Sequence, residues 1–130
     1  MLASLAYVSL SRIPAWSPEM LELARSCLMR NPALGITGAL YFDGVQFYQV
    51  LEGSETAITD LYTTIRADPR HSAVQTLWDG PITQRRFGAW AMKFVDGSGR
   101  AQRLRTKFEY DQVLATGTDQ TPRIQALARA

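Results

Sequence analysis

Apolar and polar positions alternate along the chain in blocks whose period changes from that of a strand to that of a helix and back. Residues 2–9 form a short, largely apolar run, which predicts a buried strand. Ser17 then acts as an N-cap, with Pro18 at the first helical position. Apolar residues recur at helical spacing up to Asn31, and Pro32 predicts the end of this helix because a residue before proline avoids helical geometry.

Two further runs, 36–42 and 45–51, are rich in β-branched and aromatic residues and predict strands. They flank an Asp-Gly pair at 43–44, which is typical of a two-residue hairpin. Residues 73–78 and 87–95 predict two more strands later in the chain.

A second amphipathic helix is expected between these two pairs of strands. Ser54 is its N-cap candidate, and Asp68-Pro69 stops it. Its apolar residues recur with the spacing i, i+3, i+4, i+7 of a helix that buries one face: Ile58, Leu61, Tyr62 and Ile65.

The order β-α-β-β-α-β-β predicts an α+β fold of ferredoxin-like type, whose right-handed crossovers place both helices on one face of the sheet. The opposite face then needs a cover. We expect residues 99–130 to cover it as one or two short helices, with a turn at 117–122. The apolar residues available for this are Leu104, Phe108, Val113, Leu114, Ile124 and Leu127.

Composition narrows the class of protein. A length of 130 residues with 46% apolar and 20% charged side chains fits one globular domain. A formal charge of +2 without a run of basic residues argues against a nucleic-acid partner. A lone Cys27 excludes a disulfide framework and a CxxC metal or redox motif. Without a signal-peptide pattern or an apolar run of ~20 residues, we expect a cytoplasmic protein with no membrane partner and no metal.

Strand periodicity places two polar side chains among apolar ones. Tyr7 shares a face with Leu5 and Ser9, and Gln49 shares a face with Phe47. Because a buried polar group without a partner costs about 1–3 kcal/mol, Tyr7 and Gln49 should bond each other or a ligand. Taken singly, either residue is more typical of ordinary strand packing or of a solvent-facing position.

These residues stand in motifs that resemble the BLUF domain (blue light using flavin) across residues 2–95. A hairpin or an amphipathic helix arises in many folds, whereas this constellation in this order is specific to the family. The motifs are Tyr7-x-Ser9, Asn31 followed by Gly-Ile-Thr-Gly at 35–38, Phe-Tyr-Gln-Val-Leu-Glu-Gly at 47–53, Asp-Pro-Arg-His at 68–71, Arg-Phe at 86–87 and Trp-Ala-Met at 90–92.

The resemblance implies a non-covalent flavin between the two helices. Tyr7 is then the photochemical electron and proton donor, and Gln49 lies between its hydroxyl and the N5/O4 edge of the ring. Asn31 is expected to bind the carbonyl edge of the ring, with a helix C-cap as its alternative role. Arg70 and His71, in a turn that exposes the histidine, are expected toward the pyrimidine side; Arg70 is alternatively a surface ion-pair partner.

Trp90, Met92 and Phe94 are expected to share one face of the last strand. The resemblance implies that either Trp90 or Met92 lies beside Gln49, and that Ser9 is the hydroxyl that can bond a displaced tryptophan. Ala91 departs from the common pattern, because a serine is frequent there in the family.

The resemblance thus implies a blue-light photoreceptor with FAD, or alternatively FMN or riboflavin, as its cofactor. Residues 1–98 would form the flavin-binding domain and 99–130 a helical output segment. We expect no enzyme activity, a separate downstream signalling protein and a homo-oligomer. A non-photoactive ferredoxin-like binding module is the first alternative, and a flavin-dependent enzyme is a weaker one, because no acid–base constellation or nucleotide fingerprint is present.

Overall fold

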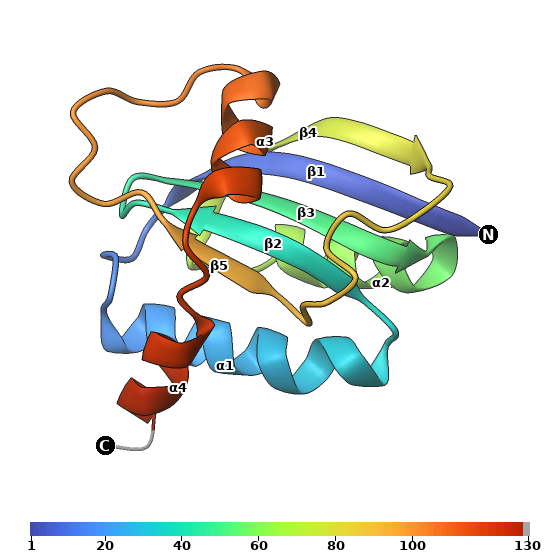
Figure 1. The fold of residues 1–130 in the computed structure, drawn as a ribbon, viewed down its shortest axis with the longest axis horizontal. Coiled ribbons are helices and arrows are strands. Elements are labelled where there is room, and N and C mark those ends of the chain that lie inside the picture. The colour runs from blue at the N-terminus through green and yellow to red at the C-terminus, as the bar shows by residue number, and fades with distance from the viewer. Residues whose placement is uncertain (129–130) are drawn as a thin grey trace.

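The computed structural model describes residues 1–128, in which a five-stranded sheet is flanked by helices (Figure 1). The strands follow the order β4-β1-β3-β2-β5; β5 is parallel to β2, and every other neighbouring pair is antiparallel. This arrangement confirms the predicted α+β, ferredoxin-like class. The elements are β1 Leu2–Ser11, α1 Pro18–Ala33, β2 Thr37–Phe42, β3 Gln46–Ser54, α2 Glu55–Arg66, β4 His71–Pro81, β5 Lys93–Asp96, α3 Lys107–Thr116 and α4 Thr121–Ala128.

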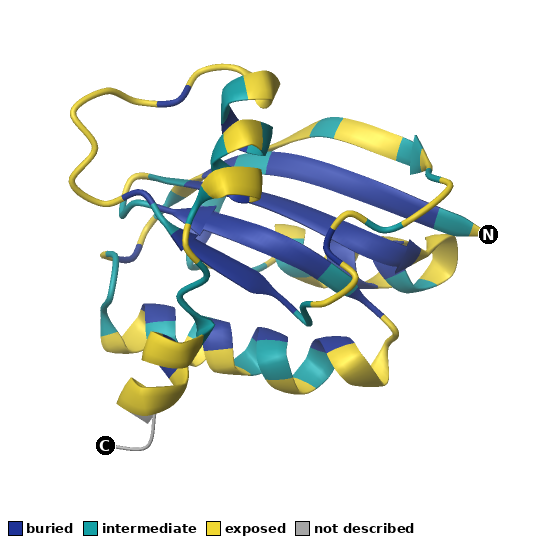
Figure 2. Ribbon diagram, in the orientation of Figure 1, coloured by how far each residue is buried: buried dark blue, intermediate teal, exposed yellow. Residues whose placement is uncertain are grey.

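The central strands are buried on both faces, so the sheet separates two hydrophobic cores (Figure 2). One core lies between the sheet and helices α1 and α2, as predicted. The other lies under α3 and the segment before β5. The first core contains Leu5, Tyr7, Leu40, Phe47, Leu51 and Met92, and the second contains Ala6, Tyr41, Tyr48, Val50, Phe87 and Leu114.

Both predicted N-caps are confirmed. The Ser17 hydroxyl accepts a hydrogen bond from the Met20 amide, and the Ser54 hydroxyl accepts one from the Ala57 amide, each at 3.1 Å. These caps start α1 and α2 at the residues that the sequence indicates.

The predicted end of α1 is wrong, because Pro32 lies inside the helix. Proline in the last turn removes only one hydrogen bond, that of its own missing N–H, and the carbonyl of Asn31 still accepts bonds from the Leu34 and Ile36 amides. The helix ends before Gly35, whose φ of +66° is the left-handed conformation that glycine adopts without a steric penalty.

The predicted two-residue hairpin is also wrong in length. The strands end in the pair Phe42 and Phe47, so the connection is longer than an Asp-Gly turn alone. The Asp43 carboxylate explains this, since its Oδ1 accepts hydrogen bonds from the amides of Val45 (2.8 Å) and Gln46 (2.7 Å) and stabilises the wider loop.

The last strand is much shorter than predicted, because β5 begins at Lys93 rather than at residue 87. Backbone amides before β5 form hydrogen bonds to a side chain instead of to a neighbouring strand. The carboxylate of Glu52, 1% exposed, accepts hydrogen bonds from the Arg86 amide (2.6 Å) and the Phe87 amide (2.9 Å). This segment is therefore fixed to the end of β3 instead of pairing as a strand, and Trp90 precedes β5.

The tail after residue 98 covers the second face only in part. Helix α3 packs on that face, whereas α4 lies beside α1 at the other side of the sheet (Figure 1). Ile124 inserts into the first core, which explains the docking of α4. Phe108 and Leu127, which we expected to contribute to the cover, are 73% and 43% exposed. The last two residues of the predicted tail, 129 and 130, lie outside the described residues.

Within residues 1–128 no helix combines the length and the apolar character that a membrane span requires.

Candidate functional site

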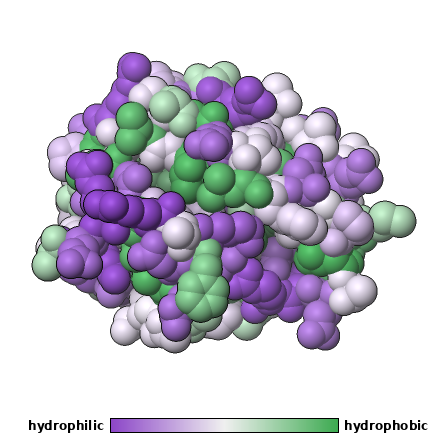
Figure 3. Space-filling model, turned by 90° about the horizontal axis from the view of Figure 1, so that it is seen from above, coloured by the Kyte–Doolittle hydropathy of each residue, from purple (hydrophilic) through white to green (hydrophobic). Residues whose placement is uncertain are grey.

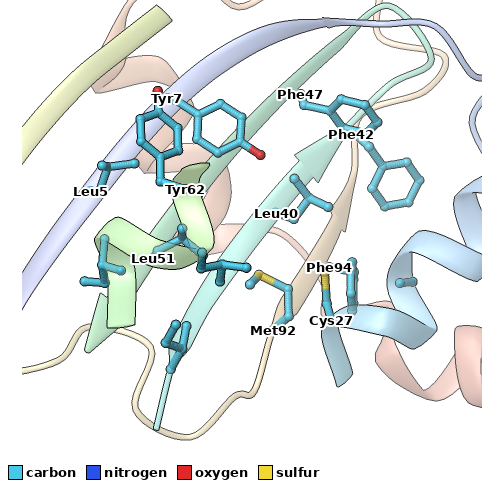
Figure 4. Close-up of a cluster of buried hydrophobic side chains, with 14 of the residues drawn as sticks. Leu5, Tyr7, Cys27, Leu40, Phe42, Phe47, Leu51, Tyr62, Met92 and Phe94 are labelled. Atoms are coloured by element: carbon cyan, nitrogen blue, oxygen red, sulfur yellow. The ribbon is translucent and has the colours of Figure 1, made fainter. Parts of the chain in front are cut away.

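A narrow pocket of about 40 Å³ opens between α1 and α2, over the first core. Tyr7, Leu40 and Phe47 project into it from the sheet, and Cys27 faces them from α1 (Figure 4). Its lining residues are Tyr7, Leu23, Ser26, Cys27, Arg30, Leu40, Phe47, Gln49, Ile65, Asp68, Arg70 and His71.

Tyr7 and Gln49 meet at the floor of this pocket. They are directly opposite each other in the β1–β3 ladder, and each is only 3% exposed. The Tyr7 hydroxyl donates a hydrogen bond of 2.5 Å to Oε1 of Gln49. The prediction that these two buried polar groups bond each other is confirmed.

Burial raises the pKa of Tyr7 well above its ordinary value, chiefly because the buried site disfavours the phenolate, with a smaller contribution from Cys27. The phenol therefore keeps its proton throughout the neutral pH range. Its ring packs against the ring of Tyr62 with centroids 5.5 Å apart, so its orientation does not depend on the hydroxyl alone.

Met92, not Trp90, lies beside Gln49. The Nε2 group of Gln49 is 3.7 Å from the Met92 sulfur, which is a weak acceptor. Trp90 packs at the second core, on the opposite side of the sheet, where its Nε1 donates to Oδ2 of Asp119 at 3.1 Å. Of the expected common face, Met92 and Phe94 do lie together in the first core, but Trp90 packs at the second, so the expectation is wrong for Trp90, which precedes β5.

His71 is buried, at 9% exposed, and begins β4, so the expectation of an exposed turn residue is wrong. Its Nδ1 lies 2.7 Å from the Ser9 hydroxyl, and its Nε2 lies 2.6 Å from the carbonyl of Ile65. Since a carbonyl only accepts, Nε2 carries the proton and Nδ1 accepts from Ser9 in the neutral ring. Ser9 is thus bonded to the histidine on one side of the sheet, while Trp90 is on the other.

Charged side chains from α1 and from the loop after α2 surround the mouth of the pocket. Arg70 forms a bidentate ion pair with Asp68, in which the shortest distance between nitrogen and oxygen is 2.6 Å. Burial alone would raise the pKa of Asp68, but the hydrogen bonds from Arg70 outweigh it and lower that pKa. Opposite them, the Arg30 guanidinium of α1 contacts the Cys27 sulfur, a weak acceptor, at 3.8 Å and Oδ1 of Asn31 at the long distance of 3.4 Å.

Asn31 is fully buried but does not line the pocket. Its Nδ2 donates to the carbonyl of Ala91 at 2.9 Å, so the side chain connects the last turn of α1 to the segment that carries Met92. Its backbone carbonyl, rather than its side chain, forms the hydrogen bonds at the C-terminal end of the helix.

Cys27, Arg30, Ser26 and Leu23 are lining residues that the sequence did not single out. Their spacing of i, i+3, i+4 and i+7 from Leu23 marks one face of α1 and would have identified them. Burial raises the pKa of Cys27, and Arg30 opposes this shift only in part, which disfavours a thiolate in the pocket.

The polar groups of the pocket suit a flat ligand rich in acceptors. Nε2 of Gln49 contacts the weakly accepting Met92 sulfur, and the Arg30 guanidinium contacts the Cys27 sulfur and, at a long distance, one amide oxygen, so both groups have donor capacity for a ligand. Apolar side chains from the sheet and both helices supply the flanking surfaces. Within residues 1–128 no group of three or more His, Cys, Asp or Glu side chains could hold a metal ion.

Comparison with known proteins finds the same family of sensors. Residues 2–93 match the BLUF family, described as sensors of blue light using FAD. The β subunit of the photoactivated adenylate cyclase of Euglena longa is 39% identical over 94 residues, which cover 71% of this chain and 11% of that protein. The corresponding subunit of Euglena gracilis is also 39% identical over the same shares. The chain therefore spans about a tenth of the length of these curated relatives.

Two solved structures share the fold and much of the sequence. The dark state of BlrB, a BLUF protein, is 35% identical with a TM-score of 0.73, and the match covers 98% of this chain and 92% of that one. BlrP1 of Klebsiella pneumoniae, solved with manganese and cyclic diGMP, is 33% identical with a TM-score of 0.69, and the match covers 99% of this chain and 32% of that one.

Proposed function

Because the chain belongs to the BLUF family of sensors of blue light that use FAD, we propose that it converts a change in the hydrogen bonds of Gln49 into a signal for another protein. The observation that carries this proposal is the buried bond between Tyr7 and Gln49, with the Met92 sulfur as the weak partner of the same carboxamide. Absorption spectra recorded before and after blue light test it.

The pocket between α1 and α2 is the proposed flavin site. The bound flavin supplies absorption of blue light and an excited state that oxidises a nearby phenol. Gln49 and Arg30 would donate hydrogen bonds to its ring, and Leu40, Phe47 and Ile65 would flank it. Since the space measures only about 40 Å³, side chains that line the pocket would have to shift to admit a ring.

Tyr7 is the proposed electron and proton donor, with Gln49 as the relay. A phenol that keeps its proton and bonds directly to Oε1 of Gln49 can release both, first the electron and then the proton along this bond. A carboxamide has a donor end and an acceptor end, so its ends can exchange roles by rotation or tautomerisation while both remain bonded. No covalent bond to the protein is needed.

Met92 is the proposed sensor of this change. Its sulfur accepts the Nε2–H of Gln49 in this structure, which we assign to the dark state. If the carboxamide reverses, an oxygen faces the sulfur in place of a donor, and the contact loses its attraction. A small change at Gln49 would thereby shift the segment that carries Met92, which Asn31 connects to α1. In this way a local change in hydrogen bonding biases a larger element.

Replacing Asn31 tests the coupling of α1 to this segment. We expect Asn31→Ala to lower flavin affinity about tenfold, because one hydrogen bond to the Ala91 carbonyl is lost and the pocket wall loosens. The photocycle of the flavin that remains should persist. Flavin occupancy after purification measures this effect. Pro32→Ala, in the same turn of α1, is the control and should keep normal occupancy. Unchanged occupancy in Asn31→Ala would contradict a role of Asn31 in flavin binding.

The tail is the proposed output segment, with 1–98 as the sensor part and 99–130 as the element that responds. Its linker bonds directly to the segment that carries Met92: the Thr121 hydroxyl reaches the carbonyl of Met92 at 3.3 Å, and the Gln120 amide reaches the carbonyl of Phe94 at 2.8 Å. Lys93 adds a bond of 2.8 Å from its Nζ to the carbonyl of Leu114, at the C-terminal end of α3.

Light should therefore loosen the docking of α3 and α4. We expect amides in 107–128 to exchange with solvent faster in the light than in the dark, because these short helices bury little apolar surface and open at low cost. Amides in β1 and β3 should not change and serve as the internal control. Hydrogen exchange read by mass spectrometry decides it; identical exchange of 107–128 in both states alongside a shifted flavin band would assign the signal to another surface.

The partner is proposed to be a separate signalling protein, with the sensor acting as a homo-oligomer in the cytoplasm and without catalytic activity of its own. The relatives support the signalling role itself, because a photoactivated adenylate cyclase subunit and a protein solved with cyclic diGMP match this chain over a part of their own longer chains.

A further inference from the structure

The positive charge of the chain is concentrated in one short segment. Residues 97–107, which run from the end of β5 to the first residue of α3, contain four basic side chains and no acidic one. The rest of the chain contains the other 10 of 14 basic residues and all 12 acidic ones, so it is slightly negative. The four basic residues are Arg100, Arg103, Arg105 and Lys107.

This segment borders an open groove of about 1090 Å³ on the side of the sheet away from the flavin pocket. Val8 of β1 and Leu77 of β4 are half-buried in its floor, and Leu104 and Tyr110 form its wall. Arg103 and Arg105 stand along it. Figure 3, which looks down on this end of the molecule, shows apolar side chains gathered in the middle of the face with hydrophilic ones around them.

Of the three basic side chains that line the groove, two have no ion-pair partner within residues 1–128. Lys107 pairs with Asp111 at 2.6 Å, but among residues 1–128 no carboxylate lies within 4.0 Å of the guanidinium groups of Arg103 or Arg105. Glu109, the acidic residue of the groove, directs Oε1 to the amides of Arg105 and Thr106 and to the Thr106 hydroxyl. It caps α3 and leaves the arginines free for a partner.

We propose that this groove binds an acidic segment of a partner protein, in which carboxylates alternate with apolar side chains. The two arginines would meet the carboxylates, and Val8 and Leu77 would take the apolar residues. This inference rests on the proposed function, since it names the chemistry of the partner to which the sensor signals.

A nucleic acid fits the groove less well. The aromatic side chain that lines it, Tyr110, is 2% exposed and stacked on Tyr48 with centroids 4.8 Å apart, so this ring is not available to stack on a base. The negative charge of the remaining chain would also repel a long polyanion.

The groove is connected to the sensor through α3. The Tyr110 hydroxyl donates at 2.8 Å to Oε1 of Gln46, on β3, and at 3.0 Å to the carbonyl of Leu104. The other end of the same helix is held by Lys93, one residue after Met92. A partner in the groove would therefore contact the helix whose docking is proposed to change with light.

Binding of defined probes to the 130-residue protein in the dark tests the proposal. The probes are a short fluorescein-labelled peptide in which Glu alternates with Leu, the same peptide with Gln in place of Glu, and a short single-stranded DNA. Fluorescence anisotropy should show binding of the Glu peptide only, weakening as salt is raised. The double variant Arg103→Glu/Arg105→Glu should lose at least about tenfold in affinity, because two attractions become repulsions.

The matched control is Arg12→Glu/Arg25→Glu, which changes the net charge equally on surfaces outside the groove. It should leave affinity within about twofold, as expected for remote exposed charges at physiological salt. Absence of binding, equal loss in both double variants, or preference for the DNA would each overturn the proposal. The light-induced absorption shift, recorded for the same variants, reports separately on the sensor, so failure of the groove and failure of the photoreceptor are distinguishable.

Discussion

Tyr7→Phe is expected to abolish the light-induced red shift while leaving flavin bound. The phenylalanine ring keeps the contact with Tyr62, so the pocket retains its shape, but the hydroxyl that bonds Oε1 of Gln49 is lost. Without that hydroxyl the relay has no phenolic donor in hydrogen-bond contact, and flavin fluorescence should last longer. Absorption difference spectra and fluorescence lifetimes measure both effects.

Tyr62→Phe provides the matched control for this variant. It removes a phenol hydroxyl from the neighbouring ring, where the bond of 2.7 Å is to Thr76 rather than to the relay. It should keep a normal red shift. A normal photocycle in Tyr7→Phe, or its loss in both variants, would contradict the role of Tyr7 as the donor.

Gln49→Leu is expected to abolish the signalling state and to shift the dark spectrum slightly to the blue. Leucine approximates the volume but bonds neither the Tyr7 hydroxyl nor a flavin carbonyl. The Tyr7 hydroxyl is then buried without a partner, which costs about 1–3 kcal/mol. The free energy of unfolding should fall by up to this amount, because burial of the leucine side chain offsets part of the loss.

Gln46→Leu is the control on the same strand. Gln46 bonds Tyr110 on the opposite side of the sheet and is not among the residues that line the flavin pocket. It should keep the photocycle, although it too loses a hydrogen bond. A light-induced red shift in Gln49→Leu would assign the relay to another residue.

The frame of the fold is predictable from the sequence, because local chemistry decides it. Ser17 and Ser54 start the two helices through bonds to amides three residues on, and the right-handed crossovers place both helices on one face of the sheet. The pairing of Tyr7 with Gln49 follows from strand alternation and from the cost of burying either group alone.

The segment from residue 82 to 92 is not predictable in this way, because its structure depends on a distant carboxylate. In the sequence Glu52 stands at the end of a predicted strand, yet its carboxylate accepts hydrogen bonds from the amides of Arg86 and Phe87 and holds this segment out of the sheet, and Met92 rather than Trp90 contacts Gln49. The position of α4 is not predictable from the sequence either, because an apolar residue such as Ile124 could pack on either core, and only the structure places it in the first.

The absorption spectrum of the purified protein before and after blue light shows whether Gln49 and a bound flavin form a photosensor. We predict a yellow protein whose flavin band shifts to the red on illumination and returns in the dark, because the Gln49 carboxamide changes its bonds without forming a covalent one. A colourless protein would instead support a non-photoactive binding module, and a yellow protein with an unchanging band would support a redox role. Either result would contradict the account.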